Sequence, residues 1–560
     1  MLGMAARSSN LRDFMYALMR TAYLPAELPP IITTKSFSQF CRDDYATLKA
    51  QMGALTRQST QYVNFSIPRT NGNRRLLALV HPKAQIATCL ALCNNRSEIK
   101  RLLCDNGVSL YDTSEDIKRD KAFKGLDFKE ARTRKAKLSS DYKYVVQADV
   151  SRFFYTIYTH SLPWAVLGKS KAKQLLAERR LHRHWSSQLD FAMQAGQSRE
   201  TFGIPVGPDT SRVLAEILLA GVEHEPELQP YLIGDRSFRL MDDFFIGAND
   251  EAEGMSILGA LRRALDNYNL HLNEEKSGVV RSYKLFTERW KLDFETLTVS
   301  DINPADQGRD IERLIEFSLH CCDESASALP ATWACRRLLS LKNIEENFST
   351  ILVALLRLAR DFPFCTSHVA EFLINNQKRC RSPEFSGRIK RWVTTMLDTH
   401  LKHRDDFEVA WCLVVCGVLK LQLDDKDLAA ADARPNSIIF SIMGLLIQKG
   451  LLKTNLAKWG WRAEAKQNGV NSNNWLFVYE AVQRKWTTDR ELVAAVKNDD
   501  VLGKMFSKDV SFLDDELLDV SSISVVRRRF QKKASGEKKS RERSKSSADL
   551  EPSDEMLDYF

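Results

Sequence analysis

The chain has 560 residues, of which 44% are hydrophobic and 27% charged, a composition that is typical of a globular protein. With 24 glycines and 16 prolines it is not collagen-like, and its length predicts two or three domains, because one core rarely exceeds about 300 residues. The net charge is +9, yet ten Lys and Arg against two Glu lie between Arg527 and Lys545. The rest of the chain is therefore close to neutral, which permits a nucleic-acid partner without requiring one.

The first 60 residues predict a helical extension. Apolar residues recur at helical spacing from Leu11 to Tyr23 and stop before Pro25, and a second helical pattern follows Asp43. From Tyr62 the pattern alternates as in a strand, and Asn71-Gly72 separates it from a second apolar strand. This arrangement predicts a β-hairpin, since Asn-Gly favours the tight turn that joins two strands.

The middle of the chain, residues 61–300, predicts a mixed α+β domain. A basic stretch, Lys118–Lys137, precedes the apolar strand Tyr144–Ala148, and helical patterns then alternate with short strands. Beyond about residue 310 the strand patterns disappear, so residues 301–524 predict an all-α domain of successive helices. Residues 525–560 are rich in Lys, Arg and Ser and then acidic, and with so few core-forming residues this tail is expected to be disordered.

The eleven cysteines have no spacing that is typical of a zinc site, so we expect buried free thiols and a reducing compartment, the cytoplasm. The longest apolar stretches, around Ala410–Leu419 and Ile438–Ile447, reach only about half of a membrane span. Charges at Arg12 and Asp13 interrupt any signal-peptide core. The sequence therefore predicts a cytoplasmic protein with no membrane contact.

Three segments carry the chemistry. An apolar strand ends in Asp149, the segment Gly203–Ser211 leads into a helix, and Arg239–Gly247 carries the pair Asp242-Asp243 at the expected tip of an apolar hairpin. Carboxylates that gather in an apolar setting repel one another and are tolerated when a cation neutralises them. Oxygen ligands of this kind suit Mg²⁺, and two such ions can activate a hydroxyl and stabilise a departing pyrophosphate.

In this order and spacing, the three segments resemble motifs A, B and C of the reverse-transcriptase palm. Two flanking segments extend the resemblance over residues 60–290: Ser66–Arg75 is similar to the fingers hairpin and Leu270–Ser277 to motif D. The resemblance implies a right-hand polymerase with fingers and palm, and hence an RNA-directed DNA polymerase or a related nucleotidyltransferase. The structural alternatives, taken segment by segment, are a solvated turn at Asp242-Asp243 and a helix cap at Asp149.

Within this family, the segment Phe153–Ser161 and the Gly-Pro-Asp-Thr-Ser sequence that begins at Gly207 resemble the abortive-infection and defence-associated reverse transcriptases of bacteria. Members of that group protect cells against phage. Several of them make DNA without a template from a protein hydroxyl, while others copy a partner non-coding RNA. The resemblance also implies a HEAT-like helical-repeat domain after the polymerase and assembly into a homo-oligomer.

The same resemblance assigns the metal site. It implies that Asp149 and Asp242 bind two Mg²⁺ ions, which Mn²⁺ could replace, with the backbone carbonyl of Val150 and the carboxylate of Asp243 as further ligands. Phe154 corresponds to the aromatic residue that lies under the sugar and excludes a 2′-hydroxyl. The structural alternative for Phe154 is an ordinary core aromatic.

The resemblance assigns the nucleotide contacts as well. Arg69 and Arg75 correspond to basic residues that hold the triphosphate, with an ordinary solvated hairpin as the alternative. Lys276 corresponds to a general acid for the leaving pyrophosphate, with a surface lysine as the alternative. Gly207 and Ser211 correspond to small residues that let the motif B helix approach the nucleotide.

Two departures from the family pattern concern the template. Leu240 stands where motif C usually has an aromatic residue, and Val206 stands where motif B commonly has glutamine. Both leave the carboxylates intact, so they affect templated copying more than nucleotidyl transfer. They favour protein priming without a strict template, with Tyr16, Tyr23 and Tyr45 as the candidate primers.

We therefore predict an antiviral DNA polymerase that uses deoxynucleoside triphosphates and makes single-stranded DNA. One alternative is RNA-templated synthesis on a non-coding RNA. An alternative of another class is a catalytically idle helical scaffold that binds a phage or host protein.

Overall fold

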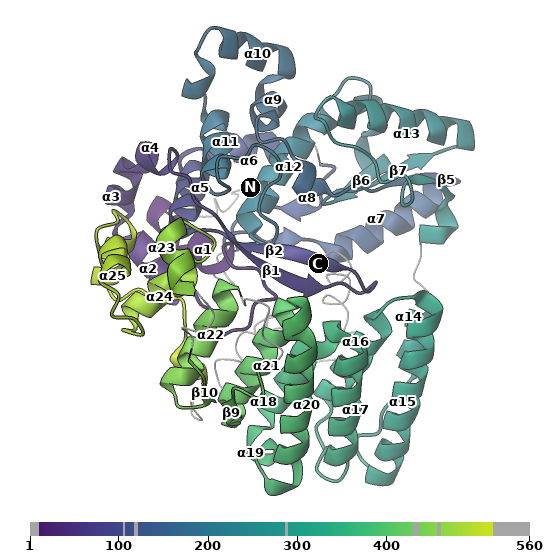
Figure 1. Cartoon of the computed structure of the whole chain (residues 1–560). Coiled ribbons are helices and arrows are strands. Elements are labelled where there is room, and N and C mark those ends of the chain that lie inside the picture. Colours follow the sequence, from purple (N-terminus) through teal and green to yellow (C-terminus); the bar gives the residue numbers. More distant parts are fainter. Residues whose placement is uncertain are drawn as a thin grey trace, which may run out of the picture.

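The computed structural model describes residues 10–104, 107–116, 121–285, 289–428, 436–455 and 461–518 (Figure 1). The predicted disordered tail, residues 525–560, lies outside the described residues. Within the described ranges, no helix combines the length and apolarity that a membrane span requires. All eleven cysteines are free, and ten of them are buried, which confirms the prediction of buried thiols.

The N-terminal segment is helical, as predicted. Helix α1 (Leu11–Thr21) begins at Asn10, whose side chain accepts a hydrogen bond from the Asp13 amide, and it buries one apolar stripe. Helices α2 (Lys35–Asp43), α3 (Tyr45–Ala50) and α4 (Met52–Leu55) follow. The predicted hairpin is also present: β1 (Val63–Pro68) pairs antiparallel with β2 (Arg74–Leu79), and Gly72 adopts a φ of +78° in the turn.

A four-stranded antiparallel sheet forms the centre of the middle domain, in the order β6 (Ser237–Leu240), β7 (Asp243–Ala248), β5 (Tyr144–Ala148) and β8 (Gly278–Arg281). Alternate residues face opposite sides. Val146 and Ile246 pack into the main core with helix α13 (Glu251–Asp266), whereas Val145 and Phe245 pack into a second core with helix α7 (Phe128–Asp141). Figure 1 shows α13 and α7 on either side of these strands.

Helices also fill the intervals between the strands. Before the sheet lie α5 (Pro82–Asn94), α6 (Arg96–Cys104) and the short strands β3 (Tyr111–Asp112) and β4 (Gly125–Leu126). Between β5 and β6 lie α8 (Phe153–Thr156), α9 (Ser161–Leu167), α10 (Lys169–Ala177), η1 (Leu181–Arg183), α11 (Trp185–Ala195) and α12 (Asp209–Glu223). Helix α12 is buried along nearly its whole length, which places the motif B segment at the centre of the molecule.

The C-terminal part is almost entirely helical, as predicted, and its successive helices pack as antiparallel neighbours such as α15 with α16 and α20 with α21. Its helices are α14 (Arg289–Thr296), α15 (Pro304–Ser325), α16 (Leu329–Ser340), α17 (Phe348–Asp361), α18 (Thr366–Asn375), α19 (Gln377–Cys380), α20 (Pro383–His403), α21 (Asp406–Leu419), α22 (Ser437–Gln448), α23 (Trp461–Asn468), α24 (Trp475–Gln483), α25 (Arg490–Lys497) and α26 (Leu502–Ser507). One short parallel strand pair, β9 (Leu423–Asp424) with β10 (Leu452–Lys453), interrupts them. The HEAT-like character of this part stays a prediction.

The two ends of the described chain meet. The Thr33 amide donates to the Phe512 carbonyl at 2.8 Å, and the Asp514 amide donates to the Ile31 carbonyl at 2.8 Å. Further along, the Gln61 amide donates to the Asn471 carbonyl at 2.8 Å. The segments that the sequence suggests as separate domains are therefore hydrogen-bonded to one another.

Candidate active site

Three carboxylates gather at one end of the central sheet. Asp149 follows β5, and Asp242 and Asp243 stand at the turn between β6 and β7. Because β5 and β7 are antiparallel with Ala148 opposite Phe244, the next residues outward, Asp149 and Asp243, lie side by side. The turn is tight, and Met241 in it adopts a φ of +53°. The sheet register thus brings together the residues that the sequence order predicts.

Burial and neighbouring charge raise the pKa of two of these carboxyls, Asp242 and Asp243. Burial and then the charge of Asp149 raise the pKa of Asp242 to about 6. Burial and then the charges of Asp242 and Asp149 raise the pKa of Asp243 to about 8. Such a cluster binds protons at neutral pH unless a cation compensates it. The donor set therefore fits one or two hard divalent cations such as Mg²⁺.

The motif D segment lies against Asp149. Asn273 Nδ2 donates to Asp149 Oδ2 at 2.9 Å, and the Asp149 amide donates to Ser277 Oγ at 3.1 Å. Lys276 Nζ lies 3.8 Å from Asp149 Oδ2 and remains largely exposed. Val150 is buried and forms an isolated bridge with Leu272. The structure thus places Val150 and Lys276 beside Asp149, while their roles as ligand and general acid stay predictions.

The hairpin contributes Arg75 to this site. Burial and the nearby charge of Arg69 lower the pKa of Arg75, and the charges of Tyr155, Asp242 and Glu27 act in the opposite direction. Arg69 begins the turn, since its amide donates to the Asn73 carbonyl at 2.8 Å. Arg75 therefore lies close enough to Asp242 to feel its charge, and Arg69 lies close to Arg75, while their roles as triphosphate contacts stay predictions.

Arg74 points to the other side of the hairpin. Its Nη1 and Nη2 atoms donate to the two carboxylate oxygens of Glu408 at 2.9 Å each, and its Nε atom lies 3.1 Å from Asp405 Oδ1. His400, Asp405 and Glu408 are close enough together to resemble a metal site. Because the Arg74 guanidinium already neutralises Asp405 and Glu408, this cluster is an ion-pair contact between the hairpin and α21.

Phe154 and motif B adjoin the same site. The Ile204 amide donates to the Phe154 carbonyl at 2.8 Å, and the Phe154 side chain is half-buried against the core. Gly207 has a φ of +116°, and a Cβ there would lie 2.6 Å from Pro25 Cγ, so only glycine fits. Ser211 is buried in α12 rather than open to solvent. The nucleotide contacts of Phe154, Gly207 and Ser211 stay predictions.

Residues 91–300 match the family model described as reverse transcriptase (RNA-dependent DNA polymerase). This part of the chain is a reverse-transcriptase domain. Domains of this type use divalent metal ions, and the protein is a nucleotidyltransferase of the reverse-transcriptase type. The match begins within α5 and does not include the hairpin, so the assignment of Arg69 and Arg75 stays a prediction from the resemblance of Ser66–Arg75 to the fingers hairpin.

Other comparisons add little to the reverse-transcriptase assignment. A solved structure of apo telomerase from Candida tropicalis is similar over 72% of this chain and 68% of that chain, at 11% sequence identity and a TM-score of 0.29. A likeness this weak carries no argument about fold or function. No curated protein matches the chain.

A buried ion cluster that the sequence did not reveal supports the reverse-transcriptase carboxylates. Arg239 is 1% exposed; it donates from Nε to Glu223 Oε1 at 2.6 Å and from Nη2 to Glu216 Oε2 at 2.9 Å. Its Nη1 atom also donates to the carbonyl of Met241, the strained residue before Asp242. Arg239 thus ties the motif C turn to helix α12. The one sign of this cluster in the sequence is a charged residue, Arg239, within an otherwise apolar strand.

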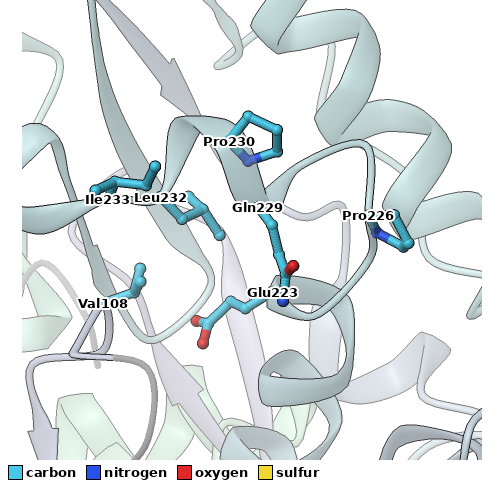
Figure 2. A pocket seen from close by; sticks show the side chains of 7 residues that line it. All are labelled: Val108, Glu223, Pro226, Gln229, Pro230, Leu232 and Ile233. Atoms are coloured by element: carbon cyan, nitrogen blue, oxygen red, sulfur yellow. The ribbon is translucent and has the colours of Figure 1, made fainter.

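A pocket of about 640 Å³ adjoins this cluster at Glu223 (Figure 2). It is lined by Val108, Glu223, Pro226, Gln229, Pro230, Leu232 and Ile233. None of Asp149, Asp242 and Asp243 lines it, and Glu223 is its link to the Arg239 cluster. The pocket is therefore distinct from the carboxylate site of the reverse-transcriptase domain.

Proposed function

We propose that this protein is a magnesium-dependent DNA polymerase of antiviral defence, which extends a protein hydroxyl with deoxynucleotides without a strict template. The observation that carries the polymerase part is the cluster of Asp149, Asp242 and Asp243 with Arg75 beside it. The defence role has its support in the resemblance of the motif A and B segments to defence-associated reverse transcriptases.

The chain's own residues supply most of the mechanism. Asp149, Asp242, Asp243 and the Val150 carbonyl would hold two Mg²⁺ ions, or Mn²⁺ in their place, which activate the attacking hydroxyl and stabilise the pyrophosphate when bound. Arg69 and Arg75 bind the triphosphate. Lys276, 3.8 Å from Asp149, is placed to give a proton to the leaving group. Phe154 excludes a 2′-hydroxyl by its bulk.

The packing around motif B supports synthesis without a template. Val206 lacks the amide that glutamine would offer, and Pro25 of the N-terminal segment lies directly against Gly207. The Thr210 amide also donates to the Ala22 carbonyl at 3.3 Å. The N-terminal segment thus takes up space beside motif B, which leaves less room for a template strand there.

The candidate primers differ in accessibility. Tyr23 is fully buried and donates its hydroxyl to the Val80 carbonyl, and Tyr45 is buried as well. Both side chains would have to leave the core to act as primers. Tyr16 is half-exposed, with Arg42 over its ring, and is the most accessible of the three. Mass spectrometry after nuclease digestion would identify the peptide that carries a nucleotide adduct.

Nucleic acid that copurifies with the protein decides between the functions. We expect DNA that stays with the protein in denaturant and is released by protease. A defined RNA with separable complementary DNA would instead support templated synthesis on a non-coding RNA. The expected partners are deoxynucleoside triphosphates, single-stranded DNA and further copies of this chain, and the free cysteines support a cytoplasmic location.

The double variant Asp242→Asn/Asp243→Asn tests whether catalysis matters at all. It removes two charges from the metal site without a change of size, so polymerisation should be lost while the melting temperature is kept or raised. Asp235→Asn/Asp250→Asn is a matched control, since neither residue adjoins the carboxylate cluster. Phage protection by Asp242→Asn/Asp243→Asn equal to that of the wild type, at equal expression, would establish the scaffold alternative.

A further inference from the structure

We propose that a row of aromatic side chains beside the active site, together with the basic helix α10, binds single-stranded nucleic acid as it leaves the site. We define the aromatic row as Tyr155, Phe202, Tyr158 and Trp164, and the basic arm as residues 169–183. The inference rests on the proposed function, because it assumes a nucleic-acid product, and it adds where that product binds.

Three rings of the row contact one another, and the row is partly open to solvent. The rings of Tyr158 and Phe202 are 4.9 Å apart with an interplanar angle of 30°, and the rings of Tyr158 and Trp164 are 5.7 Å apart. Phe202 is 63% exposed and Tyr155 is 40% exposed. The exposed rings therefore offer flat apolar faces on which nucleobases can stack.

One end of the row lies near the active site, since Tyr155 and Asp242 both act on the pKa of Arg75. Tyr155 lies in α8, which follows Asp149 by four residues, and its hydroxyl donates to the Leu76 carbonyl at 2.9 Å. Phe202 precedes Gly203, whose amide donates to the Ile157 carbonyl at 2.8 Å. The backbone of α8 and the start of motif B thus hold Tyr155 and Phe202 next to each other and next to Phe154.

The other end of the row meets the basic arm. Lys169 lies with its ammonium 4.7 Å from the centre of the Trp164 ring. Beyond it the arm exposes Lys171, Lys173, Arg179, Arg180 and Arg183. The arm has a single acid, Glu178, which lies 3.2 Å from Arg180. Figure 1 shows α10 standing out from the body of the molecule above α9.

A surface that binds single-stranded nucleic acid needs aromatic faces for the bases and cations for the phosphates. Bases stack on aromatic rings whatever their identity, while the phosphates contact Lys and Arg. Because neither contact reads sequence, this surface suits a product without a defined template. A duplex would hide its bases, so we expect the row to prefer single strands.

The experiment measures binding of a fluorescein-labelled oligodeoxythymidylate to the full chain by anisotropy, without nucleotide. We expect Phe202→Ala to weaken the Kd on the order of 10-fold, as for the loss of one stacked base, and Phe202→Trp to keep it. Lys171→Glu/Lys173→Glu should lower the slope of log Kd against log salt by about 1.4, since each lost phosphate contact accounts for roughly 0.7.

Matched controls separate this surface from general effects. Tyr283→Ala removes another aromatic side chain that is 67% exposed, and it should leave the Kd unchanged. Lys342→Glu/Lys378→Glu makes the same charge change on exposed residues of the helical part and should affect the Kd much less. A wild-type chain that does not bind the oligonucleotide would overturn the proposal, as would equal effects of the row variants and their controls. Because binding is measured without catalysis, the outcome does not depend on whether the polymerase proposal holds.

Discussion

Arg74 and Arg75 are neighbours in the sequence but belong to different parts of the molecule. Successive side chains of a strand point to opposite faces, so Arg75 reaches the carboxylate side while Arg74 reaches Glu408 in α21. A shift of one residue in the pairing of β1 with β2 would exchange the two roles. The register, with Ile67 opposite Arg75, is therefore what assigns the triphosphate contact.

We expect Arg75→Ala to raise the KM for deoxynucleoside triphosphate by about 10- to 100-fold, because it removes a charge-assisted hydrogen bond of about 1.5–3 kcal/mol. Arg74→Ala is the matched control: it should leave the KM close to that of the wild type and lower the melting temperature, since it leaves the buried Glu408 without its cation. Initial-rate kinetics and thermal unfolding of both variants measure this. An unchanged KM in Arg75→Ala would return Arg75 to a structural role.

Arg239 positions the motif C turn without contact to substrate. Arg239→Met leaves the buried carboxylates of Glu216 and Glu223 without a cation. We therefore expect it to lower the free energy of unfolding by about 3–5 kcal/mol. Arg239→Lys keeps the charge but loses the planar fork, so kcat should fall while the KM for nucleotide changes little.

Arg236, three residues before Arg239, provides a matched control. Arg236 is less buried and pairs with Glu253, so Arg236→Lys should change neither kcat nor stability by much. If Arg239→Lys had wild-type kcat, the hydrogen bond to the Met241 carbonyl would have no part in catalysis.

At the scale of elements, the hairpin β1–β2 is held by helix α21. Besides the Arg74 pairs, the Ser66 amide donates to Asp406 Oδ2 at 2.8 Å. Burial raises the pKa of Asp406 to about 7, while Arg74 acts to lower it. His400 Nδ1 donates to Asp405 Oδ2 at 2.8 Å, and this hydrogen bond helps to lower the pKa of Asp405. The pKa values of Asp406 and Asp405 are therefore shifted in opposite directions, so their contributions to stability change in opposite directions as the pH rises.

Asp406 gives a testable pH dependence. Because its pKa is higher in the folded than in the unfolded chain, its contribution to stability is largest below about pH 4 and is lost as the pH rises to about 7. Asp406→Asn removes this titration. We expect the variant to exceed the wild type in unfolding free energy by about 1–3 kcal/mol at pH 8, with a smaller difference at pH 5. Thermal or urea unfolding at the two pH values measures this, and an equal difference at both would contradict it.

At the scale of the whole molecule, the helical part packs back against the N-terminal segment, α5 and the hairpin. Lys83, buried in α5, donates to Asn471 Oδ1 at 2.9 Å and pairs with Asp499. Ser36 Oγ donates to the Ser511 carbonyl at 2.8 Å, and α21 covers β1. These contacts span more than 300 residues of sequence, so the fold closes only when the C-terminal helices are present.

A chain that ends at residue 300 should therefore not fold by itself. It would expose the apolar face of the hairpin and leave Arg74 and Lys83 without their partners. We expect it to aggregate or to lack a cooperative thermal transition in circular dichroism. A cooperative transition close to that of the full chain would show that the helical part is an independent domain.

The sequence by itself determined the elements whose signals are local. The Asn71-Gly72 turn, the strand that ends in Asp149 and the Asp242-Asp243 pair could be recognised because turn geometry and alternation depend on neighbouring residues. The order and spacing of the three motifs then indicated a reverse-transcriptase domain. The strand-poor pattern beyond residue 310 gave the helical part for the same reason.

The tertiary structure alone decided which charged groups meet. Glu216 and Glu223 look like ordinary helix residues until α12 is buried against Arg239, and the basic residues Arg134 and Lys137 turn out to pair with Asp235. Tyr23 follows the amphipathic helix α1, and its hydroxyl is buried against Val80. Local pattern carries no information about such partners, because burial and charge pairing depend on segments that are distant in sequence and adjacent only after folding.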